Sequence, residues 1–235
     1  MSRRWVKVLA IAVVVVAVLF TLVDRVAVHY ADKEVAQLAK EKYGYGNTTD
    51  GHLDLAIKGF PFLTQVAGGT LHHVTLDAGR FYVSNTTNAR GGYLHIERLH
   101  LDLNDVTVTS LSGRRAEANL ATGTLTLSYK ELSGAVTRLA GDGGPLTVSQ
   151  ASGSSGQAAR VRISGTVGGK AVNGIGTLLA QGDELTLNLP GVERANMVWT
   201  VGLPSGAGFT AARADEDGVE MSIVGHQVNL GSSRY

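Results

Sequence analysis

The segment LHIERLHLDLNDVTVT, residues 94–109, decides the fold because apolar and polar residues alternate along it. Alternation with a period of two places one set of side chains on each face of a β-strand. The apolar positions change parity at residues 97 and 98 and again at residues 104 and 105. Each change suggests a β-bulge, which adds one residue to one strand and sharpens its bend. The sequence therefore predicts a long strand that curls into a trough or barrel.

Shorter alternating segments lie on both sides of this strand and are separated by clusters of Gly, Asn, Ser and Asp, which is typical of antiparallel meanders and hairpins. They lie around residues 53–57, 74–78, 125–129, 146–148, 161–163, 185–189, 197–203 and 219–223. One interruption has helical spacing: Leu132, Val136 and Leu139 share a face, and Gly141 follows. We expect a short helix over residues 129–140.

The amino terminus has the pattern of a membrane anchor. Arg3, Arg4 and Lys7 precede the uncharged residues 8–23, a run of sixteen that is rich in Val, Ala and Leu. A span needs about 20 apolar residues, but flanking charged side chains can reach the headgroups. Basic residues stay on the cytoplasmic side, so the amino terminus is predicted inside the cell and the rest of the chain outside.

A cleaved signal peptide is the alternative interpretation of this start. The residues after the run offer Ala27 and Ala31 but not two small residues at the required spacing, so an uncleaved anchor is favoured. We therefore expect a single-pass anchor in the cytoplasmic membrane over residues 1–24 and an extracytoplasmic domain over residues 25–235. Val28, Ala31, Val35 and Leu38 continue with helical spacing, which predicts a helix that extends to about residue 42.

Composition excludes several classes of function. The chain has no cysteine, so it has no disulfide, thiolate metal site or cysteine nucleophile. Its net charge of +1, from 21 Lys and Arg against 20 Asp and Glu, does not provide the basic footprint of a nucleic-acid-binding protein. The residues beyond the anchor are enough for one continuous core that folds without covalent help.

No catalytic constellation is recognisable, and neither a cofactor nor a metal is predicted. No serine lies in a Gly-x-Ser-x-Gly elbow. His72 and His73 are adjacent in a predicted strand and so point to opposite faces. A bulge could bring His95 and Glu97 onto one face, which leaves a metal there as a weaker alternative. The paired acids at 183–184 and 215–217 are predicted to be solvated hairpin tips.

The segment KGFPFLTQV, residues 58–66, is the most informative about function. Apolar side chains cluster around a proline that breaks strand pairing. This aromatic turn is either a buried plug at one end of the barrel or an apolar lip over a lipid-binding trough, because the mouth of such a trough needs apolar side chains. The predicted lipid-binding residues are Phe60, Pro61, Phe62, Leu63 and Val66, with Lys58 and Arg80 as cations for a phosphate, although either cation alone could be ordinary surface charge.

Residues 57–74, IKGFPFLTQVAGGTLHHV, resemble the signature of the actinobacterial LmeA-like phospholipid-binding family, with weaker similarity over most of the chain. The resemblance implies an envelope protein that binds anionic phospholipids, phosphoinositides included, and supports assembly of lipid-anchored glycans. It also implies a tubular lipid-binding (TULIP-like) fold. We expect an α+β protein with a long N-terminal helix packed in a highly curved antiparallel sheet or an elongated β-barrel.

A binding role requires an apolar interior, whereas an enzyme requires convergent polar groups with shifted pKa values, and the sequence supplies the first. We therefore predict a non-enzymatic protein. A scaffold or accessory domain for an envelope glycosyltransferase has nearly the same composition and stays an alternative. An exposed apolar patch without an apolar interior would favour it.

Overall fold

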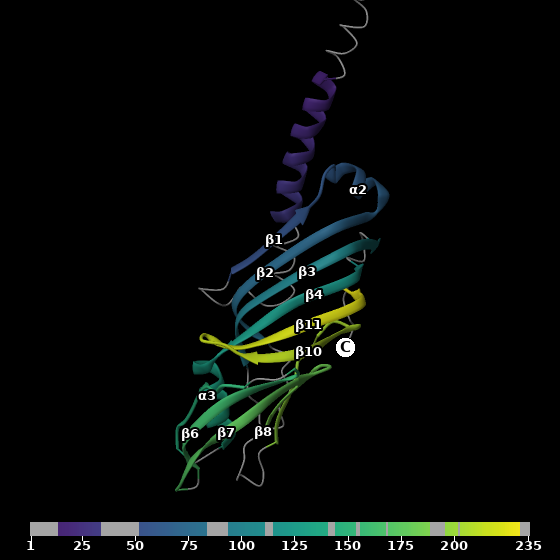
Figure 1. Ribbon diagram of the computed structural model, residues 1–235. Helices are drawn as coiled ribbons and strands as arrows, with labels where there is room; N and C mark the ends of the chain where they lie inside the picture. The colour runs from purple at the N-terminus through teal and green to yellow at the C-terminus, as the bar shows by residue number, and fades with distance from the viewer. Residues whose placement is uncertain are drawn as a thin grey trace, which may run out of the picture.

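The structure is a computed structural model with one N-terminal helix and two antiparallel sheets (Figure 1). It describes residues 14–33, 52–83, 94–110, 115–140, 144–153, 156–167, 169–188, 196–201 and 203–230. The predicted N-terminal cations and the continuation of the first helix to residue 42 lie outside the described residues.

The N-terminal helix, Val14–Lys33, has 20 residues and a mean hydropathy of 1.8 over its most apolar window. It is long and apolar enough to cross a membrane, and a signal sequence would meet the same criterion. Its first residues are exposed, whereas Asp24 and Val28 are buried against the rest of the protein. Only the later part of the helix therefore packs on the domain.

The larger sheet has six strands in the order β1-β2-β3-β4-β11-β10, and every neighbouring pair is antiparallel. The strands are β1 (His52–Lys58), β2 (Thr70–Val83), β3 (Leu94–Ser110), β4 (Arg115–Ser128), β10 (Ala207–Ala214) and β11 (Gly218–Asn229). A seven-residue helix, α2 (Phe62–Gly68), connects β1 to β2 beside the N-terminal helix (Figure 1).

The smaller sheet has five strands in the order β5-β6-β7-β8-β9. They are β5 (Leu146–Gln150), β6 (Ala158–Val167), β7 (Lys170–Gln181), β8 (Glu184–Asn188) and β9 (Asn196–Thr200). Helix α3 (Tyr129–Ala140) follows β4 and packs on β5. This sheet lies at the end of the molecule opposite the N-terminal helix (Figure 1).

Buried apolar side chains form two clusters. The lower cluster fills the space between the two sheets and α3, and Trp199 is its largest fully buried side chain. The upper cluster joins Val28 of the N-terminal helix and Phe62 of α2 to the core-facing side of β1 to β4. Each cluster gives one end of the elongated molecule its own apolar support.

The α+β architecture with a curved antiparallel sheet is confirmed. The helix over residues 129–140 and the hairpin positions of the acidic residues 183–184 and 215–217 are confirmed as well. The barrel alternative is not observed, because both sheets are open among the described strands. The sheets are joined at one edge, where Gly182 and Phe209 exchange backbone hydrogen bonds of 3.2 and 2.6 Å.

The two predicted bulges in β3 are wrong in their cause, although the parity changes are real. Ile96, Leu103 and Val106 are buried, so the core-facing positions do change parity twice along the strand. The pairing with β2 nevertheless keeps its register: Leu71 pairs with Val106 and His73 with Asn104. Gly79 pairs with Arg98 and Phe81 with Ile96 in the same register, so no residue is inserted on one strand at either parity change.

Residues with positive φ lie at the two places where the core-facing positions change parity. Asp105, with φ of 49°, lies at the parity change of residues 104 and 105. Arg80, with φ of 53°, lies on β2 opposite the parity change of residues 97 and 98. A single left-handed residue can reverse the facing of a strand without changing its length relative to its partner. The register shift in β3 lies elsewhere, between Val108 and Ser110 opposite β4.

Candidate functional site

The predicted aromatic turn contains helix α2, which sequence spacing did not reveal. Gly59, with φ of 102°, turns the chain away from β1, and Gly69, with φ of 74°, ends the helix. A left-handed glycine is the usual end of a helix because it carries no Cβ. The backbone N–H of Gly69 then donates to the carbonyl of Val66 at 3.0 Å.

The structure separates the two phenylalanines of this segment. Phe62 is 6% exposed and belongs to the upper core cluster, whereas Phe60 is 52% exposed. Val66 is also 52% exposed, and Pro61 and Leu63 are partly buried. Phe62 therefore has the position expected of the plug, and Phe60 and Val66 have the exposure expected of the lip.

Two carboxylates fasten the N-terminal helix to this region. Asp24 Oδ1 accepts a hydrogen bond from the backbone N–H of Leu63 at 2.7 Å, at the first turn of α2. Asp32 Oδ1 accepts from the N–H of Ile57 at 2.9 Å, on the edge strand β1. Backbone donors at a helix start and at a sheet edge otherwise lack partners, so both bonds satisfy groups that need them.

A cation lies at the same level as the exposed phenylalanine. The guanidinium carbon of Arg25 is 5.5 Å from the centroid of the Phe60 ring, within the range of a cation–π contact. Arg25 follows Asp24 directly, so the hydrogen bond to Leu63 and the cation–aromatic pair lie within one turn of the N-terminal helix.

The two predicted phosphate-binding cations do not lie together. Lys58 ends β1 and pairs with His73, whereas Arg80 lies seven residues further along β2. At a rise of about 3.3 Å per residue, seven residues correspond to roughly 23 Å, so one phosphate cannot contact both side chains. Lys58 is close in sequence to Phe60, and Arg80 belongs to the far end of the β1–β2 pair.

A row of leucines crosses the core-facing side of the larger sheet between the two core clusters. Leu55 pairs with Leu76, and Leu76 pairs with Leu101, so the three side chains lie in register on adjacent strands. All three are only partly buried. Gly123 continues the row on β4, where an added Cβ would lie 2.6 Å from Cδ2 of Leu101. The absent side chain leaves room for Leu101 to lie across β4.

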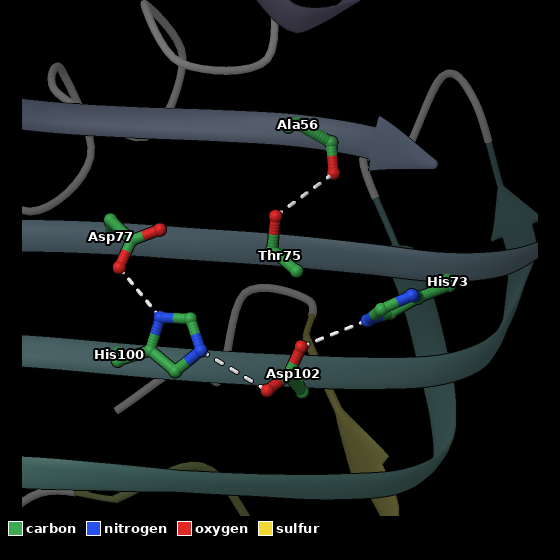
Figure 2. Close-up of polar contacts among 6 residues, drawn as sticks. All are labelled: Ala56, His73, Thr75, Asp77, His100 and Asp102. Carbon is green, nitrogen blue, oxygen red and sulfur yellow. Dashed lines mark hydrogen bonds and ion pairs between the residues drawn. The ribbon is translucent and has the colours of Figure 1, made fainter. Parts of the chain in front are cut away.

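The opposite face of the same strands carries a chain of histidine and aspartate side chains (Figure 2). His100 lies 2.6 Å from Asp77 through Nδ1 and 3.1 Å from Asp102 through Nε2. His73 Nε2 contacts the other oxygen of Asp102 at 2.8 Å. A neutral imidazole carries only one N–H, so His100 donates both of its bonds only when its ring is protonated.

The chain of carboxylates shifts the titration of its members. The hydrogen bond to Asp77 raises the pKa of His100 above its ordinary 6.5, with a smaller contribution from Asp102. The hydrogen bond from His73, with a second from His100, lowers the pKa of Asp102 below its ordinary 3.8. Both shifts favour the charged forms of the two side chains.

The first testable prediction concerns pH. A raised pKa of His100 contributes stability that is complete below 6.5 and is lost as the pH rises through the folded pKa. A lowered pKa of Asp102 contributes stability above 3.8 that is lost as the pH falls through its folded pKa. As the pH rises above 6.5, the melting temperature should therefore decrease slightly. The lost stability should be that of an exposed ion pair, up to about 1 kcal/mol.

Asp77→Asn is the test of this assignment, because it removes the larger cause of the His100 shift. Melting curves of the parent and the variant on both sides of pH 6.5 should show a smaller pH-dependent loss in the variant. An equal loss in both proteins would assign the pH dependence to other groups.

No group of three or more potential ligands is arranged to hold a metal among the described residues. The alternative metal pair of His95 and Glu97 therefore gains no third ligand there. The backbone N–H of His95 instead donates to Glu131 of α3 at 3.2 Å. This hydrogen bond joins β3 to α3.

The site residues described above lie within the part of the chain that matches a known protein family. A family model described as LmeA-like phospholipid-binding matches residues 22–224. The chain belongs to this family. Neither the curated proteins nor the solved structures contain a significant match. The resemblance predicted from residues 57–74 is confirmed, and the match to the LmeA-like family includes both Asp24 and Asp32.

The LmeA-like family is described as phospholipid-binding, and the acyl chains of a phospholipid bind apolar surface rather than polar clusters. The alternation of these leucines predicts strands but does not by itself indicate a binding role. The signal was present as matched alternation in residues 53–57, 74–78 and 99–103. Only the observed register shows that Leu55, Leu76 and Leu101 lie side by side.

Proposed function

We propose that this member of the LmeA-like family binds an anionic phospholipid outside the cytoplasmic membrane, with the acyl chains against the leucine row of Leu55, Leu76 and Leu101. Family membership is the observation that carries this proposal. The partly buried leucines support it because each methylene removed from water contributes about 0.8 kcal/mol. An acyl chain laid across three strands would bury many methylenes.

The headgroup in this proposal lies near the start of α2. Lys58 and Arg25 are the cations close to Phe60, one by sequence and one by its contact with the ring. A phosphate attracts both side chains, and arginine can contact it through two N–H groups. Pro61, Leu63 and Val66 then form the apolar border around the site, and the buried Phe62 lies behind them as the plug. Arg80 is a separate candidate for a second anionic contact.

The proposed attachment is a single-pass anchor, with the amino terminus inside and the domain outside. The apolar helix Val14–Lys33 supports this attachment. The division into residues 1–24 and 25–235 places Asp24, which packs on the domain, at the boundary itself. Phosphoinositide specificity and support of lipoglycan assembly in the envelope belong to the same proposal, which assigns binding and no catalysis to the chain.

Native mass spectrometry of the full chain, exchanged from membranes into a mild detergent, tests the proposal. We expect a retained phospholipid, with anionic species enriched over their share of the source membrane. A chain that retains no phospholipid and binds none when an anionic phospholipid is added would contradict binding. That result would favour the scaffold role beside an envelope glycosyltransferase.

The second prediction tests the leucine row. Leu76→Asp places a charge between Leu55 and Leu101, and the affinity for an anionic phospholipid should fall by about tenfold or more, since 1.4 kcal/mol corresponds to a factor of ten. Titration of a fluorescent anionic phospholipid into the full chain in detergent measures this affinity.

Thr126→Asp is the matched control for Leu76→Asp. Thr126 is partly buried in the same sheet but lies next to Leu125 and Leu127, which face the core, so its side chain faces the other way. The affinity of Thr126→Asp for the anionic phospholipid should stay close to that of the parent. Melting curves should show that Thr126→Asp and Leu76→Asp are both folded. Equal affinity of Leu76→Asp and the parent would remove the leucine row from the site.

A further inference from the structure

We infer that α2 and the turn before it dock into the outer leaflet of the membrane that the N-terminal helix crosses, with Phe60 of the turn and Val66 of α2 as the inserted side chains. This inference rests on the proposed membrane attachment and adds a second contact surface to it. Its partner is the bilayer itself, at the boundary between headgroups and acyl chains.

The position of α2 along the N-terminal helix is the first observation. The bond of 2.7 Å from Leu63 N–H to Asp24 fixes the start of α2 beside the last residues of the apolar run. Asp24 is 0% exposed, so this contact is shielded from solvent. A bilayer that surrounds residues 14–23 therefore ends next to α2, on the side where the domain begins (Figure 1).

The surface of α2 is the second observation. The helix contains no acidic residue in its first turn and no basic residue in its last turn, and its sequence FLTQVAG has no charged residue at all. Phe60 and Val66 are each 52% exposed although both are apolar. The helix residues Leu22, Val23 and Val26 are also more than half exposed. The exposed apolar side chains of Phe60, just before α2, and of Val66, on α2, therefore add to those of the N-terminal helix.

The cation at Phe60 is the third observation, and its place at the end of the apolar run supports the bilayer as the partner. Arg25 lies over the Phe60 ring at 5.5 Å, at the point where the apolar run meets charged residues. Aromatic rings and arginine side chains are favoured at the interface between lipid and water, where the ring is buried and the guanidinium reaches phosphates. Lys58 adds a second cation beside the same surface.

Because Asp32 also holds the edge strand β1, the helix and the domain are joined at two points eight residues apart. Two bonds on one face of a helix resist rotation of the domain about its connection. The domain would therefore keep one orientation, with the smaller sheet furthest from the membrane (Figure 1).

Single-cysteine labelling tests this docking, because the natural chain has no cysteine. Phe60→Cys and Val66→Cys each receive an environment-sensitive fluorophore, and the full chain is placed in nanodiscs containing an anionic phospholipid. Val18→Cys labels the helix itself, and Arg162→Cys labels an exposed position on β6 in the smaller sheet. Lipids with a quencher at a shallow or a deep acyl position report the depth of each label.

We expect labels at positions 60 and 66 to emit at shorter wavelength and to be quenched most by the shallow quencher. The label at position 18 should be quenched most by the deep quencher. The label at position 162 should keep the emission wavelength it has in water and should not be quenched by either lipid. If the labels at 60 and 66 emit as in water and are not quenched, while the label at 18 is strongly quenched, the docking is overturned and the anchor stands. Background emission at 18 would overturn both, while phospholipid retention by mass spectrometry would still decide the proposed function separately.

Discussion

Replacing Phe62 by alanine is expected to lower the free energy of unfolding by about 3–5 kcal/mol, the usual cost of removing a buried phenylalanine ring. Phe62 is 6% exposed and lies in the upper cluster with Val28, Ile57 and Val74. These residues come from the N-terminal helix, β1 and β2. Loss of the ring should therefore loosen the attachment of α2 as well as the sheet.

Phe60→Ala is the matched control, because the same change two residues away removes a ring that is 52% exposed. Its effect on the free energy of unfolding should stay within about 0.5 kcal/mol, as for surface substitutions. Thermal melting of the full chain in detergent measures both variants. Equal melting temperatures for the parent and Phe62→Ala would show that Phe62 is not a core residue.

The same pair refines the lip hypothesis. The sequence alone does not distinguish Phe60 from Phe62, and a double serine variant would lose stability and lipid contact at once. Phe60→Ser alone should weaken binding to anionic liposomes more than Lys58→Ala, because an exposed lysine–phosphate contact contributes about 1 kcal/mol or less and is screened by salt. Stronger loss with Lys58→Ala would make the headgroup, rather than apolar contact, the main determinant.

The sheet was predictable wherever large apolar residues alternate with polar ones. β3, β8 and β11 have this pattern, and their strands appear close to where it predicts them. β10 was missed because AGFTAARA contains mainly Ala, Gly and Thr, which give little contrast between the two faces. β7 was missed because the large apolar residues of KAVNGIGTLLAQ, which are Val172, Ile175, Leu178 and Leu179, do not alternate with a period of two. Both are strands through pairing with their neighbours, β7 with β6 and β8, and β10 with β11.

Helix α2 and the site around it depend on contacts that local sequence does not encode. Seven residues are too few to show a helical period, and Gly59 and Pro61 both favour a turn. The bond from Leu63 to Asp24 joins residues 39 positions apart. The distance between Lys58 and Arg80 likewise follows from the register of β1 on β2.

Replacing Asp24 by alanine should release α2 from the N-terminal helix and lower the free energy of unfolding by about 1.5–3 kcal/mol, the range for a hydrogen bond to a charged group. Asp24 is fully buried, and its Oδ2 has no hydrogen-bond partner among the described residues. The bond from Leu63 is thus the contact that compensates for burying this carboxylate. Hydrogen exchange at the Leu63 amide should become faster in Asp24→Ala.

Asp24→Asn separates the hydrogen bond from the charge. Asparagine keeps an oxygen that can accept from Leu63 and removes the cost of burying a carboxylate, so its stability should stay close to that of the parent or exceed it. Asp32→Ala is the control for position, because it should speed exchange at Ile57 and leave Leu63 protected. Unchanged exchange at Leu63 in Asp24→Ala would mean that apolar packing around Val28 and Phe62 holds α2 in place without the carboxylate, and the fixed orientation of the domain would then rest on that packing alone.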